Sequence, residues 1–148
     1  MTWKPSVTVA AVMEREGRFL LVEEEDQGEF VYNQPAGHWE HGETLVQACA
    51  REVMEETAHR FEPAHLVGIY RWSPPRGLVT YLRFAFCGET LGVELERPLD
   101  EGILRAVWLA PEEIQALAPR HRSPLVWRCI EDYLVGRRYP LELIAHVG

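Results

Sequence analysis

The sequence lacks the marks of a secreted or membrane-bound protein. Its three cysteines, Cys49, Cys87 and Cys129, are scattered, odd in number and without a C-x-x-C pair, a usage typical of reduced core residues. No apolar run approaches the roughly 20 residues of a membrane helix, and no signal-peptide pattern opens the chain. We therefore expect a cytoplasmic protein without a membrane partner.

Positive charge is also scarce. The chain has 15 Lys and Arg against 23 Asp and Glu, a formal net charge of −8, whereas nucleic acids and anionic membranes favour a basic surface. A small phosphorylated partner would have to be bound by a metal ion and a few local arginines. With 148 residues, 47% hydrophobic, and no repeat or linker, residues 1–148 are expected to form a single domain, as a monomer or small homo-oligomer.

Hydrophobic patterning predicts a mixed order of strands and helices. The strand-like runs are 6–13, 18–24, 30–34, 65–72, 79–87 and 105–109. The helical segments are 44–57, 111–117 and 123–135, with Ser123 as a cap for the third. A short E-R-E-G turn between the first two runs indicates a hairpin. The expected architecture is α/β, with a mixed sheet between helices.

The most informative segment spans residues 37–59. Glu52, Glu55 and Glu56 follow one another at i, i+3 and i+4 on a helix whose early turns carry the apolar Leu45 and Ala48 on the same face. Clustered, partly buried carboxylates repel each other and are costly to desolvate, and hard divalent cations with oxygen ligands compensate best. The spacing therefore predicts an Mg²⁺ site, at which Mn²⁺ can substitute. A solvated acidic face is the alternative.

Neighbouring residues supply what such a site needs. Thr44 and Gln47 form the pattern of a capping box, which starts the helix. Glu43 is placed to form an ion pair with Arg51 and thereby fix the preceding loop. A backbone carbonyl near Gly37 is then expected to join the metal ligands.

The pattern G-x5-E-x7-R-E-U-x-E-E, with U an aliphatic residue, runs without a miss from Gly37 to Glu56 and resembles the signature of the Nudix hydrolases. The resemblance implies the Nudix fold, an α/β/α sandwich with a mixed β-sheet, and a metal-dependent phosphohydrolase. The departures are Ala58, where the family has glycine, and His59, where it has an aliphatic residue. Both follow the carboxylates, so they concern the end of the helix and not the metal site.

The chemistry expected is attack of water on phosphorus, with Glu52, Glu55 and Glu56 as metal ligands and Arg51 and Glu43 as support. The base is either one of these glutamates or a carboxylate on a later loop. Glu101 is our choice there as an auxiliary ligand or base, although an acidic solvated turn explains it equally well.

The blocks at 4–10, 33–40, 122–126 and 136–144 resemble one bacterial phosphatase of the family more closely than the family at large. That resemblance implies release of orthophosphate from 4-amino-2-methyl-5-hydroxymethylpyrimidine diphosphate, with side activity on thiamine diphosphate and nucleoside di- and triphosphates. From the residues alone the prediction stops at a diphosphate linked to another group. A pyrophosphohydrolase that releases pyrophosphate and a non-catalytic diphosphate sensor are the alternatives.

Substrate contacts are the least determined part of the site. Trp39, Asn33 and Gln34, beside the glycine loop, are expected to contact a flat, amino-bearing pyrimidine. Arg71 and Arg83 are candidates for binding a diphosphate. The hairpin aromatics and Trp108 fit the core better than a substrate platform.

Overall fold

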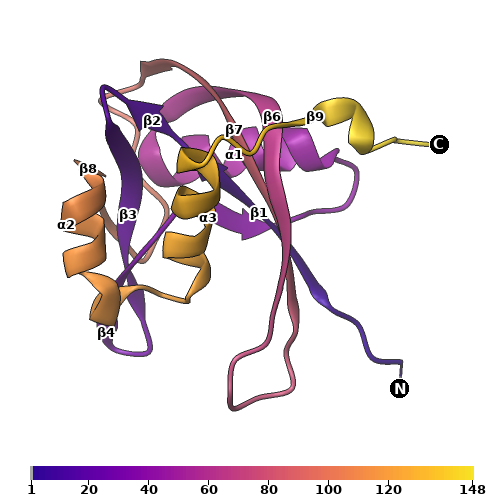
Figure 1. Cartoon of the computed structure of the whole chain (residues 1–148), viewed down its shortest axis with the longest axis horizontal. Coiled ribbons are helices and arrows are strands. Elements are labelled where there is room, and N and C mark those ends of the chain that lie inside the picture. The colour runs from indigo at the N-terminus through magenta and orange to yellow at the C-terminus, as the bar shows by residue number, and fades with distance from the viewer. Residues whose placement is uncertain (1) are drawn as a thin grey trace.

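A computed structural model describes residues 2–148 and contains two β-sheets (Figure 1). The larger has five strands in the order β5-β1-β7-β6-β9. Strand β1 runs parallel to β7, and the other neighbours are antiparallel, so the sheet is mixed. Its strands are β1 (Ser6–Val12), β5 (Ala36–His38), β6 (His59–Trp72), β7 (Tyr81–Val93) and β9 (Tyr139–Pro140).

The smaller sheet corrects one prediction. Its strands are β2 (Glu14–Arg15), β3 (Arg18–Asp26), β4 (Glu29–Asn33) and β8 (Ile103–Leu109). The expected hairpin between runs 6–13 and 18–24 is therefore wrong, because only the two-residue β2 pairs with β3 across the turn. Val9, Ala10 and Ala11 are completely buried, so β1 requires covered faces on both sides, and an interior position in the mixed sheet, between β5 and β7, provides them.

Helices cover both faces of the larger sheet. α1 (Leu45–Thr57) packs on the face that carries Val9, Ala11 and Phe86. α3 (Leu125–Leu134) packs on the opposite face, which carries Ala10 and Ala85. The remaining helical segments are α2 (Pro111–Ala116) and the short 3₁₀ turns Ala118–Arg120 and Leu141–Leu143. The layers form the predicted α/β/α sandwich.

The ends of α1 follow from local sequence. Thr44 caps the helix as predicted: its hydroxyl accepts from the backbone N–H of Gln47 at 3.0 Å, and the Gln47 side chain accepts from the backbone N–H of Thr44 at 2.9 Å. Ala58 ends the helix in the left-handed region at φ 58°, with its N–H on the carbonyl of Met54. His59, the second departure from the family pattern, is buried and begins β6. In α3, the Ser123 hydroxyl accepts from the N–H of Leu125 at 3.1 Å.

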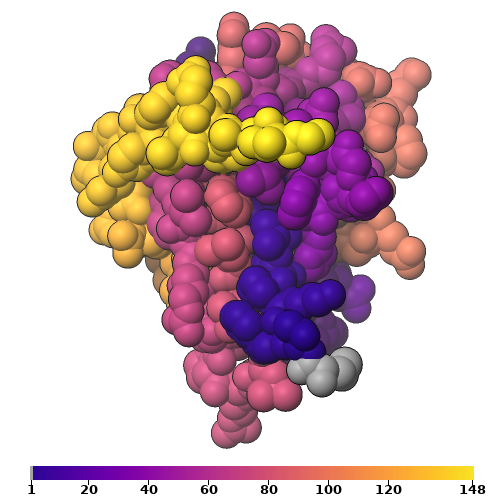
Figure 2. Space-filling view, turned by 90° about the vertical axis from the view of Figure 1, so that its right-hand side faces the viewer, coloured from indigo at the N-terminus to yellow at the C-terminus, as the bar shows by residue number. Residues whose placement is uncertain are grey.

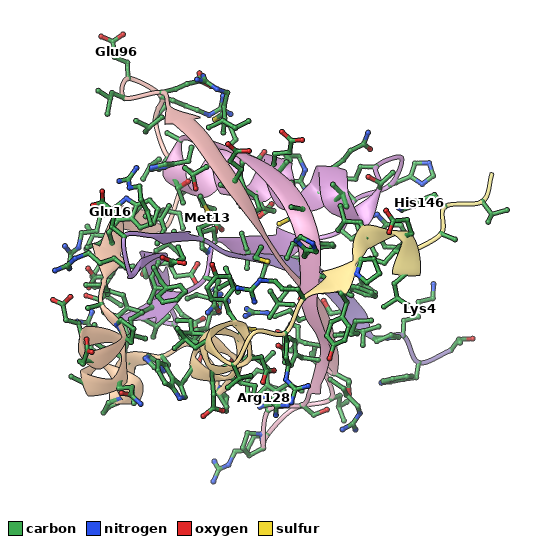
Figure 3. The ribbon with its side chains drawn as sticks, turned by 45° about the horizontal axis from the view of Figure 1, so that its top comes forward. Lys4, Met13, Glu16, Glu96, Arg128 and His146 are labelled. Carbon is green, nitrogen blue, oxygen red and sulfur yellow. The ribbon has the colours of Figure 1, made fainter. Side chains whose placement is uncertain are left out.

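The hairpin of β6 and β7 is longer than predicted and extends beyond the rest of the molecule at its turn (Figure 1). β1, β7 and β6 run side by side in Figure 2, and the C-terminal segment crosses them near one end. In Figure 3, Met13 lies inside the molecule, whereas Glu16 and Glu96 point outward. Within residues 2–148, no helix is long and apolar enough to cross a membrane.

Candidate active site

A pocket of about 690 Å³ opens where the larger sheet, the edge strand β5 and the start of α3 meet. One end is acidic and is lined by Glu24, Glu52 and Glu56. The other end is basic and aromatic. Its lining residues there include Trp72, Arg76 and Tyr81, whereas Arg83 lies between the two ends and Arg122 is paired with Glu24. The pocket therefore offers opposite charges at its two ends, which suits a ligand that carries both a metal-bound phosphate and an organic group.

The acidic end depends on β5. Glu52 and Glu56 project from α1 past this edge strand, and Glu56 accepts a hydrogen bond from the backbone N–H of Ala36 at 2.9 Å. Glu52 lies against Gly37, because a Cβ built there would be 1.7 Å from Oε2 of Glu52. Glycine at 37 is thus required by the position of the carboxylate, and the fold brings Gly37 and Glu52 into contact.

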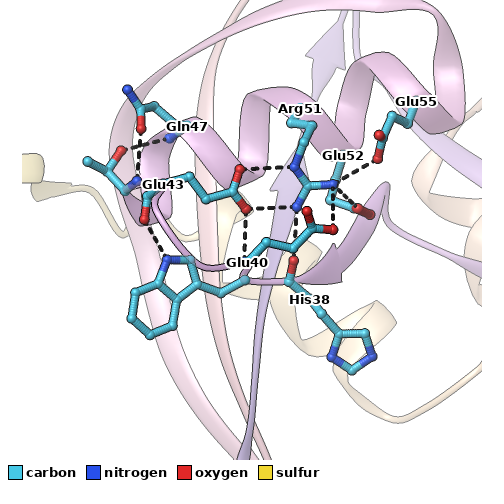
Figure 4. A network of polar contacts seen from close by, with 9 residues as sticks. His38, Glu40, Glu43, Gln47, Arg51, Glu52 and Glu55 are labelled. Atoms are coloured by element: carbon cyan, nitrogen blue, oxygen red, sulfur yellow. Dashed lines mark hydrogen bonds and ion pairs between the residues drawn. The ribbon is translucent and has the colours of Figure 1, made fainter.

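Arg51 joins the glycine loop to the glutamates (Figure 4). Its Nε and Nη2 donate to the two carboxylate oxygens of Glu43 at 3.0 and 2.8 Å, so the predicted ion pair is present and bidentate. Its Nη1 donates to Glu52 at 2.7 Å and to Glu55 at 2.8 Å, and Nη2 also reaches the carbonyl of His38. One guanidinium therefore fixes the loop and neutralises part of the cluster.

Burial shifts the titration of two of the glutamates. Desolvation raises the pKa of Glu56 to about 9. The hydrogen bond from the N–H of Ala36 lowers this pKa, whereas the charges of Glu24, Glu52 and Asp100 raise it further. Desolvation also raises the pKa of Glu52 to about 7, although Arg51 opposes the shift. The cluster is thus short of positive charge even with Arg51 in place.

Of two further acidic residues near the cluster, sequence reasoning missed Glu24 and preferred Glu101 to its neighbour Asp100. Glu24 on β3 is buried and lines the pocket, and Oε2 of Glu24 lies 2.9 Å from Nη1 of Arg122. Asp100 interacts with Glu55 and Glu56 through its charge, and its backbone N–H donates to the carbonyl of Glu55 at 2.9 Å. The one sequence signal that could have identified Glu24 as a site residue is its position as an acidic residue near the end of a buried strand. Glu101, the residue that we chose, is exposed and does not line the pocket.

The predicted substrate residues separate into three groups. Asn33 and Arg83 line the pocket. Gln34 is completely buried beneath it and donates to the carbonyl of Val126 at 2.7 Å. Trp39 and Arg71 lie outside the pocket, which corrects the prediction. The indole N–H of Trp39 is used within the loop, where it donates to the carbonyl of Glu43 at 2.7 Å.

The hairpin aromatics also correct an expectation. Trp72 and Tyr81 face each other across β6 and β7, with ring centroids 5.9 Å apart and planes 19° apart. Both line the pocket, although Trp72 also packs against a core cluster, as expected. Trp108 packs against the other core cluster and does not line the pocket, as expected. Sequence periodicity could not separate these cases, because a strand that continues into a hairpin carries the same alternation.

The acidic end fits a divalent cation chemically, although it is not a finished ligand set. Within residues 2–148, no three His, Cys, Asp or Glu side chains already converge as metal ligands, and Nη1 of Arg51 lies between Glu52 and Glu55. The carboxylates of Glu52, Glu55 and Glu56 beside the space over Gly37 are nevertheless a hard oxygen donor set, and the Glu24 carboxylate, which is paired with Arg122, lies nearby. Cation binding would require Glu52 and Glu55 to turn from Arg51.

Comparisons with known proteins agree with this site. The NUDIX domain family matches residues 2–127. Phosphatase NudJ of Escherichia coli strain K12 is 45% identical over 142 residues, which cover 96% of this chain and 92% of NudJ, and NudJ of Shigella flexneri matches equally well. A NUDIX hydrolase structure from Nitrosomonas europaea has a TM-score of 0.95 and 51% identity, covering 97% of this chain and 98% of that one. The chain therefore belongs to the Nudix hydrolase family.

Proposed function

We propose that this protein is a metal-dependent phosphatase that releases orthophosphate from small organic diphosphates. The observation that carries the proposal is the cluster of Glu52, Glu55 and Glu56, of which Glu52 and Glu56 line the acidic end of a pocket whose other end is basic and aromatic. The sequence identity of 45% to Phosphatase NudJ, over 96% of this chain, supports orthophosphate as the product.

The roles of the residues follow from their positions. Glu52, Glu55 and Glu56, with the carbonyl of Gly37, would hold Mg²⁺ or Mn²⁺. When bound, the cation supplies an acidic water and offsets negative charge on the phosphate oxygens. Arg51 and Glu43 keep the loop and the helix in register, and Glu24 adds a carboxylate from the opposite wall.

A carboxylate must accept the proton of the attacking water. We propose that one of the glutamates of α1 does so, because Glu52 and Glu56 both reach the pocket. Of the acidic residues at 100 and 101, Asp100 is the better placed for an auxiliary role, since its charge acts on Glu55 and Glu56. Glu101 was the residue expected to fill that role.

We propose 4-amino-2-methyl-5-hydroxymethylpyrimidine diphosphate as the preferred substrate, with side activity on thiamine diphosphate and nucleoside di- and triphosphates. The stacked Trp72 and Tyr81 supply an aromatic wall for a flat ring. Arg76 and Arg83, which also line the pocket, supply donors for the phosphate attached to the ring.

The competing reading is a pyrophosphohydrolase that attacks internally and releases pyrophosphate. A phosphate assay with and without added pyrophosphatase separates the two, and hydrolysis in ¹⁸O-labelled water identifies the phosphorus attacked. We expect label in orthophosphate, independent of pyrophosphatase. Label in the organic monophosphate, with pyrophosphate released from triphosphates, would contradict the proposal, and binding without turnover would indicate a sensor.

A further inference from the structure

Arg83 occupies an unusual environment in the floor of the pocket. Its side chain projects from β7 and is only 6% exposed. Its Nη1 donates to Oε1 of Gln34 at 2.8 Å and contacts Sγ of Cys129 at 3.8 Å, and its Nη2 donates to Oδ1 of Asn33 at 3.0 Å. All of these acceptors are neutral.

The positive charge of Arg83 therefore has no internal counterion. Within residues 2–148, no carboxylate lies at ion-pair distance from its guanidinium, whereas Arg51 and Arg122 both have acidic partners. Burying a charge without a partner of opposite sign is energetically unfavourable. A side chain that only connected β7 to β4 would not need a charge.

The donors of Arg83 are not exhausted by these contacts. A guanidinium carries five N–H groups, and the contacts of the described residues use two on Nη1 and one on Nη2. Two N–H groups are left for a ligand in the pocket. One of the amides that hold the guanidinium is itself fixed, because Gln34 donates to the carbonyl of Val126. The donors are therefore preorganised.

The sheet register places Arg83 between the two ends of the pocket. Thr8 on β1 lies between His38 on β5 and Arg83 on β7. Because neighbouring strands are about 4.8 Å apart, β7 lies roughly 10 Å from the edge strand beside the glutamates. Tyr81 is two residues further along β7, which is about 7 Å. The order across the pocket is thus carboxylates, guanidinium, aromatic pair.

We propose that Arg83 binds the phosphate that remains on the organic group after hydrolysis, while the transferred phosphate lies at the carboxylates. The proposal rests on the proposed function for the identity of the two phosphates. The buried charge by itself calls for an anion at this place in the pocket, with or without turnover. Arg83 is therefore a determinant of binding for both substrate and product monophosphate.

Binding to metal-free protein tests the assignment apart from catalysis. After treatment with chelator, calorimetry would measure the Kd of 4-amino-2-methyl-5-hydroxymethylpyrimidine monophosphate, with the alcohol that lacks phosphate and inorganic phosphate as comparison ligands. Arg83→Gln should raise the Kd of the monophosphate about tenfold or more, because it removes charge-assisted bonds. Arg60→Gln, which removes the same charge from an exposed position outside the pocket, is the matched control and should leave it unchanged.

A second variant guards against misfolding of Arg83→Gln. Asn33→Asp keeps the shape of the side chain and places a carboxylate next to Nη2 of Arg83. It should raise the melting temperature of the metal-free protein, because the buried charge gains a counterion, and weaken monophosphate binding. A lower melting temperature for Asn33→Asp would overturn the proposal.

Two further outcomes would also overturn it. One is an unchanged Kd in Arg83→Gln, and the other is no monophosphate binding to the metal-free wild type. An inactive wild-type protein that binds the monophosphate through Arg83 would instead contradict only the proposed function. The two failures are thereby distinguished.

Discussion

Oε2 of Glu52 lies so close to Gly37 that a Cβ at position 37 would be 1.7 Å from it. The glycine of the loop and the glutamate of the helix are therefore one structural unit. Two residues from separate elements, β5 and α1, determine together where the carboxylate points.

Gly37→Ala should displace the Glu52 carboxylate and weaken Mg²⁺ binding about 10- to 100-fold, the range found when groups that orient a metal ligand are lost. The melting temperature should change little, because the obstructing atoms end a flexible side chain. Calorimetric Mg²⁺ titration checks the affinity. If Gly37→Ala weakened binding equally in wild type and in Glu52→Gln, the effect would not pass through Glu52.

Glu56→Gln should abolish most activity and stabilise the metal-free protein. The folded pKa of Glu56 is about 9, above the ordinary 4.5, so the stability associated with its proton is complete below pH 4.5 and is lost as the pH rises toward 9. Glutamine removes that loss, and we expect a gain of roughly 1–3 kcal/mol at about pH 8 to 9 and almost none at about pH 4. Urea unfolding in chelator at both pH values measures it. Near-normal turnover of the variant in saturating Mg²⁺ would exclude Glu56 from the metal site.

Arg51→Ala should lower kcat about tenfold or more, because Glu43, Glu52 and Glu55 all lose a charged donor. Glu43→Gln should lower kcat less. The double variant should be little worse than Arg51→Ala alone, since the two residues act as a pair. Strictly additive effects on activity in this cycle would show that they act independently.

Ala58→Gly should change stability by less than about 1 kcal/mol. Relief of the left-handed φ of 58° stabilises by roughly 1 kcal/mol, but loss of the buried methyl group costs about 0.8 kcal/mol. Ala58→Val should be destabilising by about 2 kcal/mol or more, because a β-branched side chain is strained at this φ. Denaturant unfolding of both variants measures the changes. Equal stabilities of the Ala58→Val variant and the wild-type protein would show that the helix ends by another geometry.

Local signals carried most of what was predicted from the sequence. The capping box of Thr44 and the pairing of Glu43 with Arg51 depend on residues within one loop and two helical turns, so spacing determines them. The pairing partner of β1 cannot be predicted from local spacing. β7 lies far along the chain, beyond α1 and β6, and no local pattern encodes a parallel ladder.

The aromatic wall of the pocket was not predicted for the same reason, although Arg83 was named as a substrate candidate. Trp72, Tyr81 and Arg83 converge only through the register of two long strands. Trp39 was misplaced because its sequence neighbourhood beside the glycine loop suggested the pocket, whereas its indole N–H bonds within the loop. Glu24 reaches the acidic end from a strand that belongs to the other sheet.

The β6–β7 hairpin connects the region of α1, at the acidic end of the pocket, with the aromatic end of the pocket. At one end it follows directly from α1, where the carbonyl of Ala58 accepts from the N–H of Glu94 at 2.8 Å. At its other end the turn contributes Pro74, Arg76 and Val79 to the pocket wall. Because the turn and helix α1 share no hydrogen bond or ion pair among the described residues, residues 73–80 are a segment that can be exchanged as a unit. Substrate range should thus be open to redesign by loop replacement, with the hydrolytic machinery left as it is.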